Sequence, residues 1–287
     1  MARFIVLVIL LFHCDLSRLN GFFMRLLIDI GNSRIKWLFV ENEAQISLTD
    51  QAHAITHYKD FPLALIECFG EGSEFEKLLS TCSQSRPQKV LVSNVAGDQA
   101  AAAVKQFVQK RWQMKMKFAE VKREQAGIHN DYIVLSELGI DRWMAVIGAR
   151  QVFPDGDIVI INCGTAITVD VLNSANHFLG GAILPGFQLA AKSLSVADGI
   201  AEINPAAVER VIGCRTSECV QVGILSACVG GVELLIGKIK SELNNKSANL
   251  LLTGGGAQLF LSASDLEYEY DANVVMRGQN RLIECEC

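Results

Sequence analysis

The sequence predicts an α/β protein made of two copies of one strand–loop–strand unit. Runs of β-branched and apolar residues alternate with stretches of helical apolar spacing along the chain. The two halves also open alike: residues 25–30 and 35–41 flank a Gly-Asn-Ser loop, and residues 158–162 and 166–172 flank a Cys-Gly-Thr loop. Such repetition indicates an internal duplication, and 287 residues are enough for two domains.

The first half is expected to be a hairpin followed by alternating strands and helices. The hairpin strands cover 25–30 and 35–41, because both runs are rich in β-branched and aromatic residues and turn residues join them. Further elements are a buried strand over 89–95, a helix over 98–112, a short strand over 117–121 and a helix over 135–153 interrupted near Gly139. The Pro-Asp-Gly-Asp turn at 154–157 closes this half.

The second half repeats this opening and continues with a third strand. It is expected to contain strands over 158–162, 166–172, 177–184 and 250–253, and helices from Phe187 onward, over 217–243 and after Gly254-Gly255-Gly256. The long apolar helix carries Gly223, Gly230 and Gly231. These glycines predict close packing of that helix against a neighbouring element.

Composition excludes several classes of protein. Half of the residues are apolar and 20% are charged, which excludes a disordered chain. The net charge of −5 argues against a nucleic-acid-binding surface. Nine cysteines without paired C-x-x-C spacing indicate neither a zinc ribbon nor a disulfide framework. We therefore expect a cytoplasmic protein with no nucleic-acid or membrane partner.

Residues 1–23 differ from the rest of the chain. Residues 4–12 are all apolar, and as a helix they would span about 14 Å, too short for a bilayer core of about 30 Å. Their length suits a secretory signal, but no small-x-small cleavage site follows them. Met24 begins a strand that leads straight into the first loop. We expect residues 1–23 to be an N-terminal extension, with a signal or anchor and an additional packed segment as alternatives.

The loop after the first strand is a candidate phosphate-binding site. Gly31 permits a sharp turn, and Asn32 and Ser33 supply donors that could line a phosphate-sized hollow. Asp29 could bind Mg²⁺ directly or through water, and Lys36 adds positive charge. The same residue types also form ordinary hairpin turns, so this motif alone leaves both interpretations open.

Two further loops expose backbone at strand ends. The segment Asn162-Cys163-Gly164-Thr165-Ala166, followed by Asp170, repeats the first loop in the second half, with the Thr165 hydroxyl as an additional donor. Gly254-Gly255-Gly256 either leaves room for a flat ring or simply begins a helix. The glycine spacing fits neither the dinucleotide-binding nor the Walker pattern. The sequence instead predicts two phosphate loops that face each other across a cleft.

The segment Gly139-Ile140-Asp141-Arg142 places a carboxylate and a guanidinium side by side at a helix start. The carboxylate could take a proton from a substrate hydroxyl, and the guanidinium could bind a substrate carboxylate through two hydrogen bonds. A capping aspartate beside a surface arginine is the alternative.

Together the motifs resemble those of the type III pantothenate kinases, which catalyse the first step of coenzyme A synthesis and belong to the acetate/sugar kinase, actin and chaperone ATPase superfold. The motifs are Asp29-x-Gly31-Asn32-Ser33-x-x-Lys36, Gly139-x-Asp141-Arg142-Trp143, Cys163-Gly164-Thr165-Ala166, Gly180-Gly181-x-Ile183-x-Pro185-Gly186 and Thr253-Gly254-Gly255. The resemblance runs from Met24 nearly to the C-terminus. It implies two duplicated ribonuclease-H-like (actin-like ATPase) domains, over 24–138 and 139–287, with a nucleotide cleft between them. It also implies ATP-dependent phosphorylation of pantothenate to 4'-phosphopantothenate.

The resemblance implies roles for the residues that match. The ATP-binding residues would be Asp29, Ile30, Gly31, Asn32, Ser33, Arg34, Ile35, Lys36 and Thr165. The pantothenate-binding residues would be Tyr132, Gly139, Ile140, Asp141, Arg142 and Thr216. Asp141 would be the general base that deprotonates the substrate hydroxyl.

The family resemblance further implies a homodimer that uses ATP with Mg²⁺, for which Asp29 is a possible ligand, and a monovalent cation, K⁺ or NH₄⁺. The family usually has aspartate where this chain has Asn162, so we expect the requirement for the monovalent cation to be weakened or lost. Two alternatives remain: a catalytically weak relative that acts as a regulatory or accessory factor, and another small-molecule kinase of the superfold. Intact Asp29, Asp141 and Thr165 favour a kinase, and Tyr132 favours pantothenate as the substrate.

Overall fold

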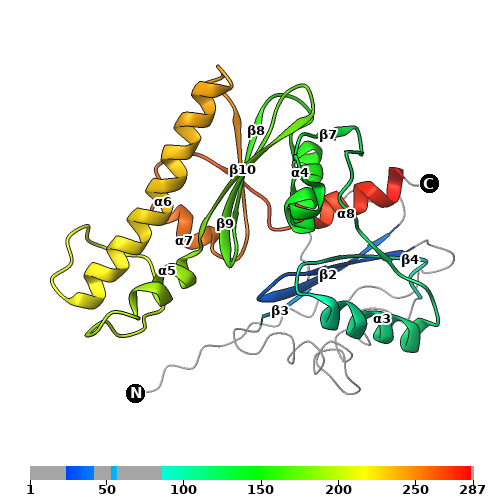
Figure 1. Cartoon of the computed structure of the whole chain (residues 1–287), viewed down its shortest axis with the longest axis horizontal. Coiled ribbons are helices and arrows are strands. Elements are labelled where there is room, and N and C mark those ends of the chain that lie inside the picture. Colours follow the sequence, from blue (N-terminus) through cyan, green and yellow to red (C-terminus); the bar gives the residue numbers. More distant parts are fainter. Residues whose placement is uncertain (1–23, 42–52, 57–85, 286–287) are drawn as a thin grey trace.

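The computed structural model describes residues 24–41, 53–56 and 86–285. The expected N-terminal extension, residues 1–23, lies outside the described residues. Within the described part of the chain, two sheets are formed, with strand orders β3-β2-β1-β4-β5 and β12-β11-β8-β9-β10-β7-β6. Helices separate the two sheets and cover their outer faces (Figure 1).

The first sheet confirms the predicted hairpin and the strand and helix that follow it. Its elements are β1 (Met24–Ile30), β2 (Arg34–Glu41), β3 (His53–Thr56), β4 (Lys89–Asn94), α3 (Asp98–Trp112) and β5 (Lys117–Phe118). Strand β1 pairs antiparallel with β2, which places Asp29 opposite Lys36, and parallel with β4.

The second sheet repeats that pairing and so confirms the predicted duplication. Its strands are β6 (Glu124–Gln125), β7 (Ile128–Asn130), β8 (Ile158–Cys163), β9 (Ala166–Leu172), β10 (His177–Pro185), β11 (Asn249–Thr253) and β12 (Glu269–Tyr270). The helices of this half are the 3₁₀ turn η2 (Leu135–Glu137), α4 (Ile140–Val152), α5 (Phe187–Leu194), α6 (Thr216–Glu242), α7 (Ala257–Leu261) and α8 (Val274–Cys285). Strand β8 pairs antiparallel with β9 and parallel with β11, as β1 does with β2 and β4.

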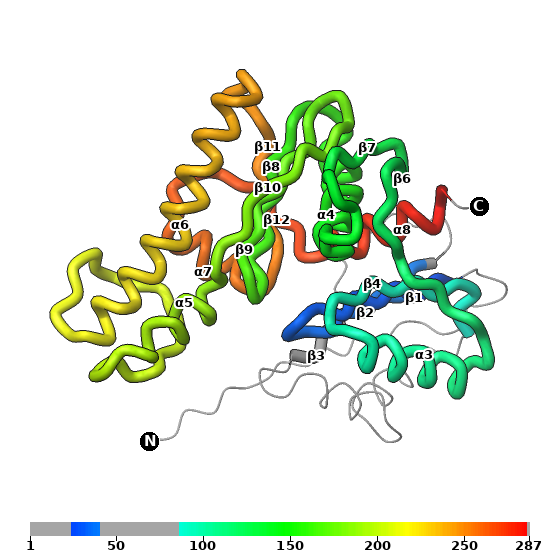
Figure 2. The backbone as a smooth tube through the Cα atoms, in the orientation of Figure 1, coloured from blue at the N-terminus to red at the C-terminus, as the bar shows by residue number. Residues whose placement is uncertain are grey.

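The layers follow from the alternation of side chains along each strand. Leu26 and Ile28 pack against α3 on the outer face of the first sheet, whereas Leu27 faces the middle layer of α4 and α8. In the second sheet Ile160 faces the same middle layer, and Val159 packs with α5, α6 and α7 on the other side. Figure 2 shows α4 and α8 between the two sheets. The middle layer therefore joins both halves into one core.

The predicted interruption near Gly139 is present. Residues 135–137 form a single 3₁₀ turn, Leu138 and Gly139 are extended, and α4 begins at Ile140. Because the helix is interrupted at Leu138 and Gly139, Asp141 lies in the first turn of α4.

The prediction that glycines of the long helix mark close packing is wrong for Gly223 and Gly230. A Cβ at either position would meet no described atom within 4 Å, and only Gly231 approaches a neighbour, the Leu184 Cδ2 at 3.1 Å from an added Cβ. The close helix contact is instead between α4 and α8, at Gly148 and Gly278. A glycine in a helix permits another element to pack closely there, but the tertiary structure decides whether one does.

Helix α6 has the length and apolar composition of a membrane-spanning helix. Core helices of soluble proteins satisfy the same criteria, and Val220, Ile224, Val229, Val232 and Ile236 of α6 are buried on the second sheet. The composition of α6 is thus weak grounds for a membrane segment.

We predict that Gly148→Ala destabilises the protein by about 1–3 kcal/mol, because an added Cβ would lie 1.8 Å from the Val274 carbonyl oxygen and force α4 away from α8. Urea unfolding of both proteins measures the difference in the free energy of unfolding. Gly237→Ala is the matched control, since its Cβ meets no described atom within 4 Å, and it should be neutral or stabilising by up to about 1 kcal/mol. Equal effects of the two substitutions would contradict the prediction.

The division into domains at 138/139 stays a proposal. Strands β6 and β7 precede it but pair within the second sheet. Helix α8 follows it but packs on β1 and β4, where Asn280 accepts a hydrogen bond from Arg25 at 2.7 Å. Segments from each side of the boundary therefore cross to the other half.

Candidate active site

The two predicted phosphate loops meet directly. The hydroxyls of Ser33 and Thr165 are hydrogen-bonded at 2.8 Å, although 132 residues separate them in the chain. The Thr165 loop is held from behind by Gly186, whose amide donates to the Thr165 carbonyl at 3.2 Å. A Cβ at Gly186 would stand 2.4 Å from that oxygen, so glycine is needed there. The hairpin loop and its counterpart in the second half thus form one site.

The third loop, residues 254–256, contacts both of the other loops. The Gly256 amide donates to the Cys163 carbonyl at 2.8 Å, and a Cβ at Gly255 would overlap the Arg34 guanidinium. Gly254 has a φ of 95°, which disfavours any residue with a side chain. Gly31, in contrast, lies outside the positive-φ region, and its turn is closed by its amide donating to the Arg34 carbonyl at 2.9 Å. The expected sharp turn at Gly31 is therefore an ordinary hairpin turn.

Asp29 and Lys36 lie side by side on the paired strands β1 and β2. Burial raises the pKa of Asp29, and the Lys36 charge and a 2.6 Å hydrogen bond from Ser93 oppose this rise. Burial also lowers the pKa of Lys36, whose ammonium donates to the Ala272 carbonyl at 3.4 Å. The Lys36 ammonium therefore lies within electrostatic reach of Asp29 and Arg34.

Asp141 is a half-buried carboxylate in the first turn of α4. Burial raises its pKa, and its Oδ1 accepts a hydrogen bond from the Arg142 amide at 2.9 Å. Its charge in turn raises the pKa values of Asp29 and Asp170, next to the dominant effect of their burial, so the three carboxyls are within electrostatic reach of one another. A Cβ at Gly139 would come within 2.6 Å of Asp141 Oδ1. Glycine at position 139 therefore leaves room for the Asp141 carboxylate.

The Arg142 guanidinium is buried, and the edge that carries Nε and Nη2 binds Asp170. Nε lies 3.1 Å from both carboxylate oxygens and Nη2 lies 2.5 Å from Oδ1. Burial would lower the pKa of Arg142, but the hydrogen bonds and charge of Asp170 raise it and hold the arginine protonated. Nη1 points to the Tyr132 hydroxyl at 3.4 Å, and the guanidinium lies over the Tyr132 ring. Nη1 is thus the guanidinium nitrogen of Arg142 that contacts Tyr132, whereas Nε and Nη2 contact Asp170.

Asn162 is the penultimate residue of strand β8, next to the loops. Its side-chain oxygen lies 2.6 Å from the place of an added Cβ at Gly254 and 3.8 Å from that at Gly164. The amide oxygen therefore faces the junction of the second and third loops.

The structure brings together most of the residues predicted for the site. Ile30 and Ile35 are fully buried against α3, so only their backbone borders the loop. Ile140 packs in the middle layer. Thr216 is not brought to the site: it is exposed at the first turn of α6, the helix that packs on the face of the second sheet away from α4.

Two residues near the site were missed from the sequence. Ser93 at the end of β4 donates to Asp29, and Gln279 of α8 donates to Ser93 at 2.8 Å and to the Ile28 carbonyl at 2.8 Å. Asp170 was noted, but its pairing with Arg142 was not. The polar Ser93 at the end of an apolar strand was a signal, whereas nothing local marks Gln279.

Two loops contributed by duplicated halves meet beside acidic side chains, an arrangement expected of an ATP-dependent phosphotransferase. The sequence comparisons give the particular family. A family model for type III pantothenate kinase matches residues 25–238, and the chain belongs to that family.

Similar curated proteins agree with this assignment, and a solved structure shares the fold. A type III pantothenate kinase of Nitrosococcus oceani is 31% identical over 264 residues, covering 90% of this chain and 93% of the relative. One from Janthinobacterium sp. is 29% identical over 266 residues, covering 89% and 95%. A Campylobacter jejuni protein described as a Baf family transcriptional activator has a TM-score of 0.52 at 22% identity, covering 91% of this chain and 98% of that chain, and supports the fold alone.

Proposed function

We propose that this protein transfers the γ-phosphate of ATP to the primary hydroxyl of pantothenate and forms 4'-phosphopantothenate, the first step of coenzyme A synthesis. The observation that carries the proposal is the hydrogen bond that joins Ser33 and Thr165 from the two halves, with Asp29 of the adjoining strand β1 within electrostatic reach of Asp141. Phosphoryl transfer depends mainly on positioning and on neutralising charge, which paired loops and a half-buried base can supply.

The proposed chemistry is divided between the loops and α4. The hydroxyls of Ser33 and Thr165, now bonded to each other, can each donate to a phosphate oxygen. Asp141 accepts the proton of the pantothenate hydroxyl as its oxygen attacks the γ-phosphorus. Its raised pKa makes it a stronger base than an exposed aspartate. The Nη1 edge of Arg142, which donates to the Tyr132 hydroxyl, would bind the rest of the substrate together with Tyr132.

Kinases of this family use ATP with a divalent metal, and the carboxylates here fit Mg²⁺. Burial raises the pKa of both Asp29 and Asp141, and the charge of Asp141 raises the pKa of Asp29 further. Such oxygen ligands suit Mg²⁺, whose charge would offset that repulsion. We propose that Asp29 holds the ion, which when bound neutralises the phosphates of ATP.

The response to a monovalent cation tests the role of Asn162. We propose that its amide oxygen contacts the cation without the charge that an aspartate supplies, so the parent enzyme should show a weak, poorly saturating response to K⁺ or none. Asn162→Asp should convert this to tight saturation. Turnover measured against K⁺ and NH₄⁺ concentration in both proteins is the test. Tight saturation in the parent would contradict it.

We propose that the protein is a homodimer, because Thr216 is not brought to the site within one chain while apolar side chains remain exposed. Ile183 on β10 and Leu234 on α6 are 63% and 61% exposed. A second copy could cover these faces. Analytical ultracentrifugation should give twice the mass of 31.4 kDa, and Leu234→Glu should shift the equilibrium toward monomer. A parent protein that sediments as a monomer at micromolar concentration would exclude the dimer.

We also propose a cytoplasmic location, which the free thiols of Cys163, Cys214, Cys219, Cys228 and Cys285 support. Mass spectrometry of the N-terminus of the native protein tests it, since a processed signal would remove residues from the start of the chain.

The decisive experiment on function is an ADP-release assay with purified protein, ATP and Mg²⁺, with and without pantothenate. Pantothenate-dependent ADP release with formation of phosphopantothenate is the expected result. ADP release with a sugar or acetate but not with pantothenate would favour another small-molecule kinase. No substrate-dependent release would favour a regulatory relative.

A further inference from the structure

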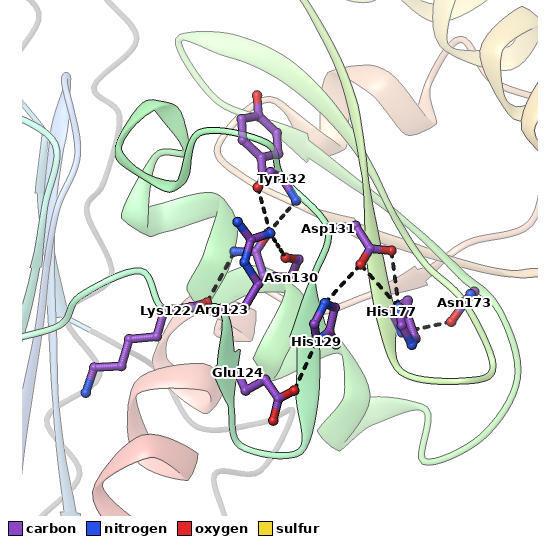
Figure 3. A network of polar contacts seen from close by, with 9 residues as sticks. All are labelled: Lys122, Arg123, Glu124, His129, Asn130, Asp131, Tyr132, Asn173 and His177. Carbon is purple, nitrogen blue, oxygen red and sulfur yellow. Dashed lines mark hydrogen bonds and ion pairs between the residues drawn. The ribbon is translucent and has the colours of Figure 1, made fainter.

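Two histidines and an aspartate gather at the edge of the second sheet, outside the site described above (Figure 3). His129 lies on β7 and His177 begins β10, and the parallel pairing of these strands places them opposite each other. The Asp131 amide donates to the Phe178 carbonyl at 3.0 Å, which continues the strand pairing by one residue. Residues two apart on an extended chain point to the same side, so His129 and Asp131 share the face that carries His177.

The three side chains have the spacing of metal ligands. Asp131 Oδ1 lies 3.3 Å from His129 Nε2 and 3.2 Å from His177 Nδ1. All three ligand atoms lie within 4.8 Å of one another. In a tetrahedral zinc site with bonds of about 2.0–2.1 Å, neighbouring ligand atoms are about 3.3–3.4 Å apart. The two contacts of Asp131 are therefore close to what one shared ion requires.

A further carboxylate orients one of the imidazoles. Glu124 Oε1 lies 3.1 Å from His129 Nδ1. A proton on Nδ1 that is donated to Glu124 leaves the lone pair of Nε2 directed at Asp131, which is how carboxylates commonly support metal-binding histidines. On the other strand, the His177 amide donates to Asn173 Oδ1 at 2.8 Å and fixes the backbone there. Figure 3 shows the carboxylates of Glu124 and Asp131 on either side of the His129 ring.

The neighbouring basic side chain, Arg123, does not lie between the two histidines and Asp131. Arg123 donates to the carbonyls of Asn130 and Tyr132, and so it neutralises neither carboxylate of the cluster directly. The side chains of His129, His177 and Asp131 are 37%, 44% and 36% exposed, so an ion can reach them from solvent.

We propose that His129, Asp131 and His177 bind one Zn²⁺ ion, with a water in the fourth position. Two imidazoles and one carboxylate suit zinc and similar transition metals better than Mg²⁺ or Ca²⁺. The ion would tie β7 to β10 directly before Tyr132, the aromatic residue that faces Arg142. Its role is thus to fix the segment that leads into the substrate pocket, without taking part in phosphoryl transfer.

The test is zinc binding by the full-length protein after removal of metal with a chelator, measured by calorimetry. The parent should bind one equivalent per chain at this site. His177→Gln should weaken binding at least about 100-fold, and Glu124→Gln, which only removes the orienting carboxylate, should weaken it by about 10- to 100-fold. His53→Gln, which removes a histidine of β3, is the matched control and should leave affinity unchanged. Kinase turnover without zinc should be the same in the His177→Gln variant as in the parent, which shows that it is folded.

Because the chain has nine cysteines, Co²⁺ serves as a spectroscopic probe of the ligands. Visible d–d bands that the parent shows and His177→Gln lacks, with no thiolate charge-transfer absorption in the near ultraviolet, would support the proposal. Thiolate absorption at one equivalent, equal binding by the parent and His177→Gln, or no saturable binding at all would overturn it and leave the cluster as an ion pair between histidine and aspartate.

Discussion

Replacing Asp141 by asparagine should lower turnover by about 10²- to 10⁴-fold, because the substitution removes the proton acceptor for the substrate hydroxyl and keeps the shape of the side chain. Affinity for ATP should be largely retained, since the phosphate loops of Ser33 and Thr165 are untouched. Steady-state turnover and calorimetric nucleotide binding measure the two effects separately. Glu137→Gln, an exposed acid in the preceding 3₁₀ turn, is the control and should change neither.

The pH dependence of the parent enzyme gives a second readout for Asp141. The base must be deprotonated, and burial raises its pKa above the ordinary value of 3.8. On acidification, kcat/KM should therefore fall at a higher pH than titration of an exposed aspartate would give, and this limb should be absent from the residual activity of Asp141→Asn. Near-normal turnover in that variant would remove Asp141 from the role of base.

The second large effect is expected on stability. Asp170→Ala should cost about 3–5 kcal/mol, because it leaves the buried Arg142 guanidinium without the carboxylate that binds its Nε and Nη2. The free energy of unfolding, measured by urea titration, is the readout. Asp155→Ala, which removes an exposed aspartate from the turn before β8, should change it by less than about 0.5 kcal/mol.

A double variant separates the loss of an ion pair from the loss of packing. Arg142→Met added to Asp170→Ala removes the unpaired charge and should recover much of the lost stability. A double variant as unstable as the sum of the two single variants would show that the residues do not interact.

The strand next to this ion pair also leaves little room for a side chain, since a Cβ at Gly181 would lie 2.8 Å from Asp170 Oδ1. This close approach explains the second glycine of the Gly180-Gly181 motif.

Local patterns were sufficient for the secondary structure around the site. The bounds of α3 and β9 agree with the predicted ranges because turn residues and a change in apolar spacing mark both ends. The repeated strand–loop–strand opening predicted the duplication, and it also predicted that the loops of Ser33 and Thr165 face each other. Those features depend on residues that are near in sequence, or on a repeat that the sequence displays twice.

The sequence by itself thus determined the α/β class, the duplicated halves, the two loops that meet at the candidate site and the position of Asp141 at a helix start. Only the tertiary structure decided that Arg142 is held by Asp170, that the close helix contact is at Gly148 and not at Gly223 or Gly230, and that His177 stands beside His129. Each of these depends on which distant segments become neighbours. Neighbours are chosen by the packing of whole faces of sheets and helices, to which any one residue contributes little, so no local pattern marks them.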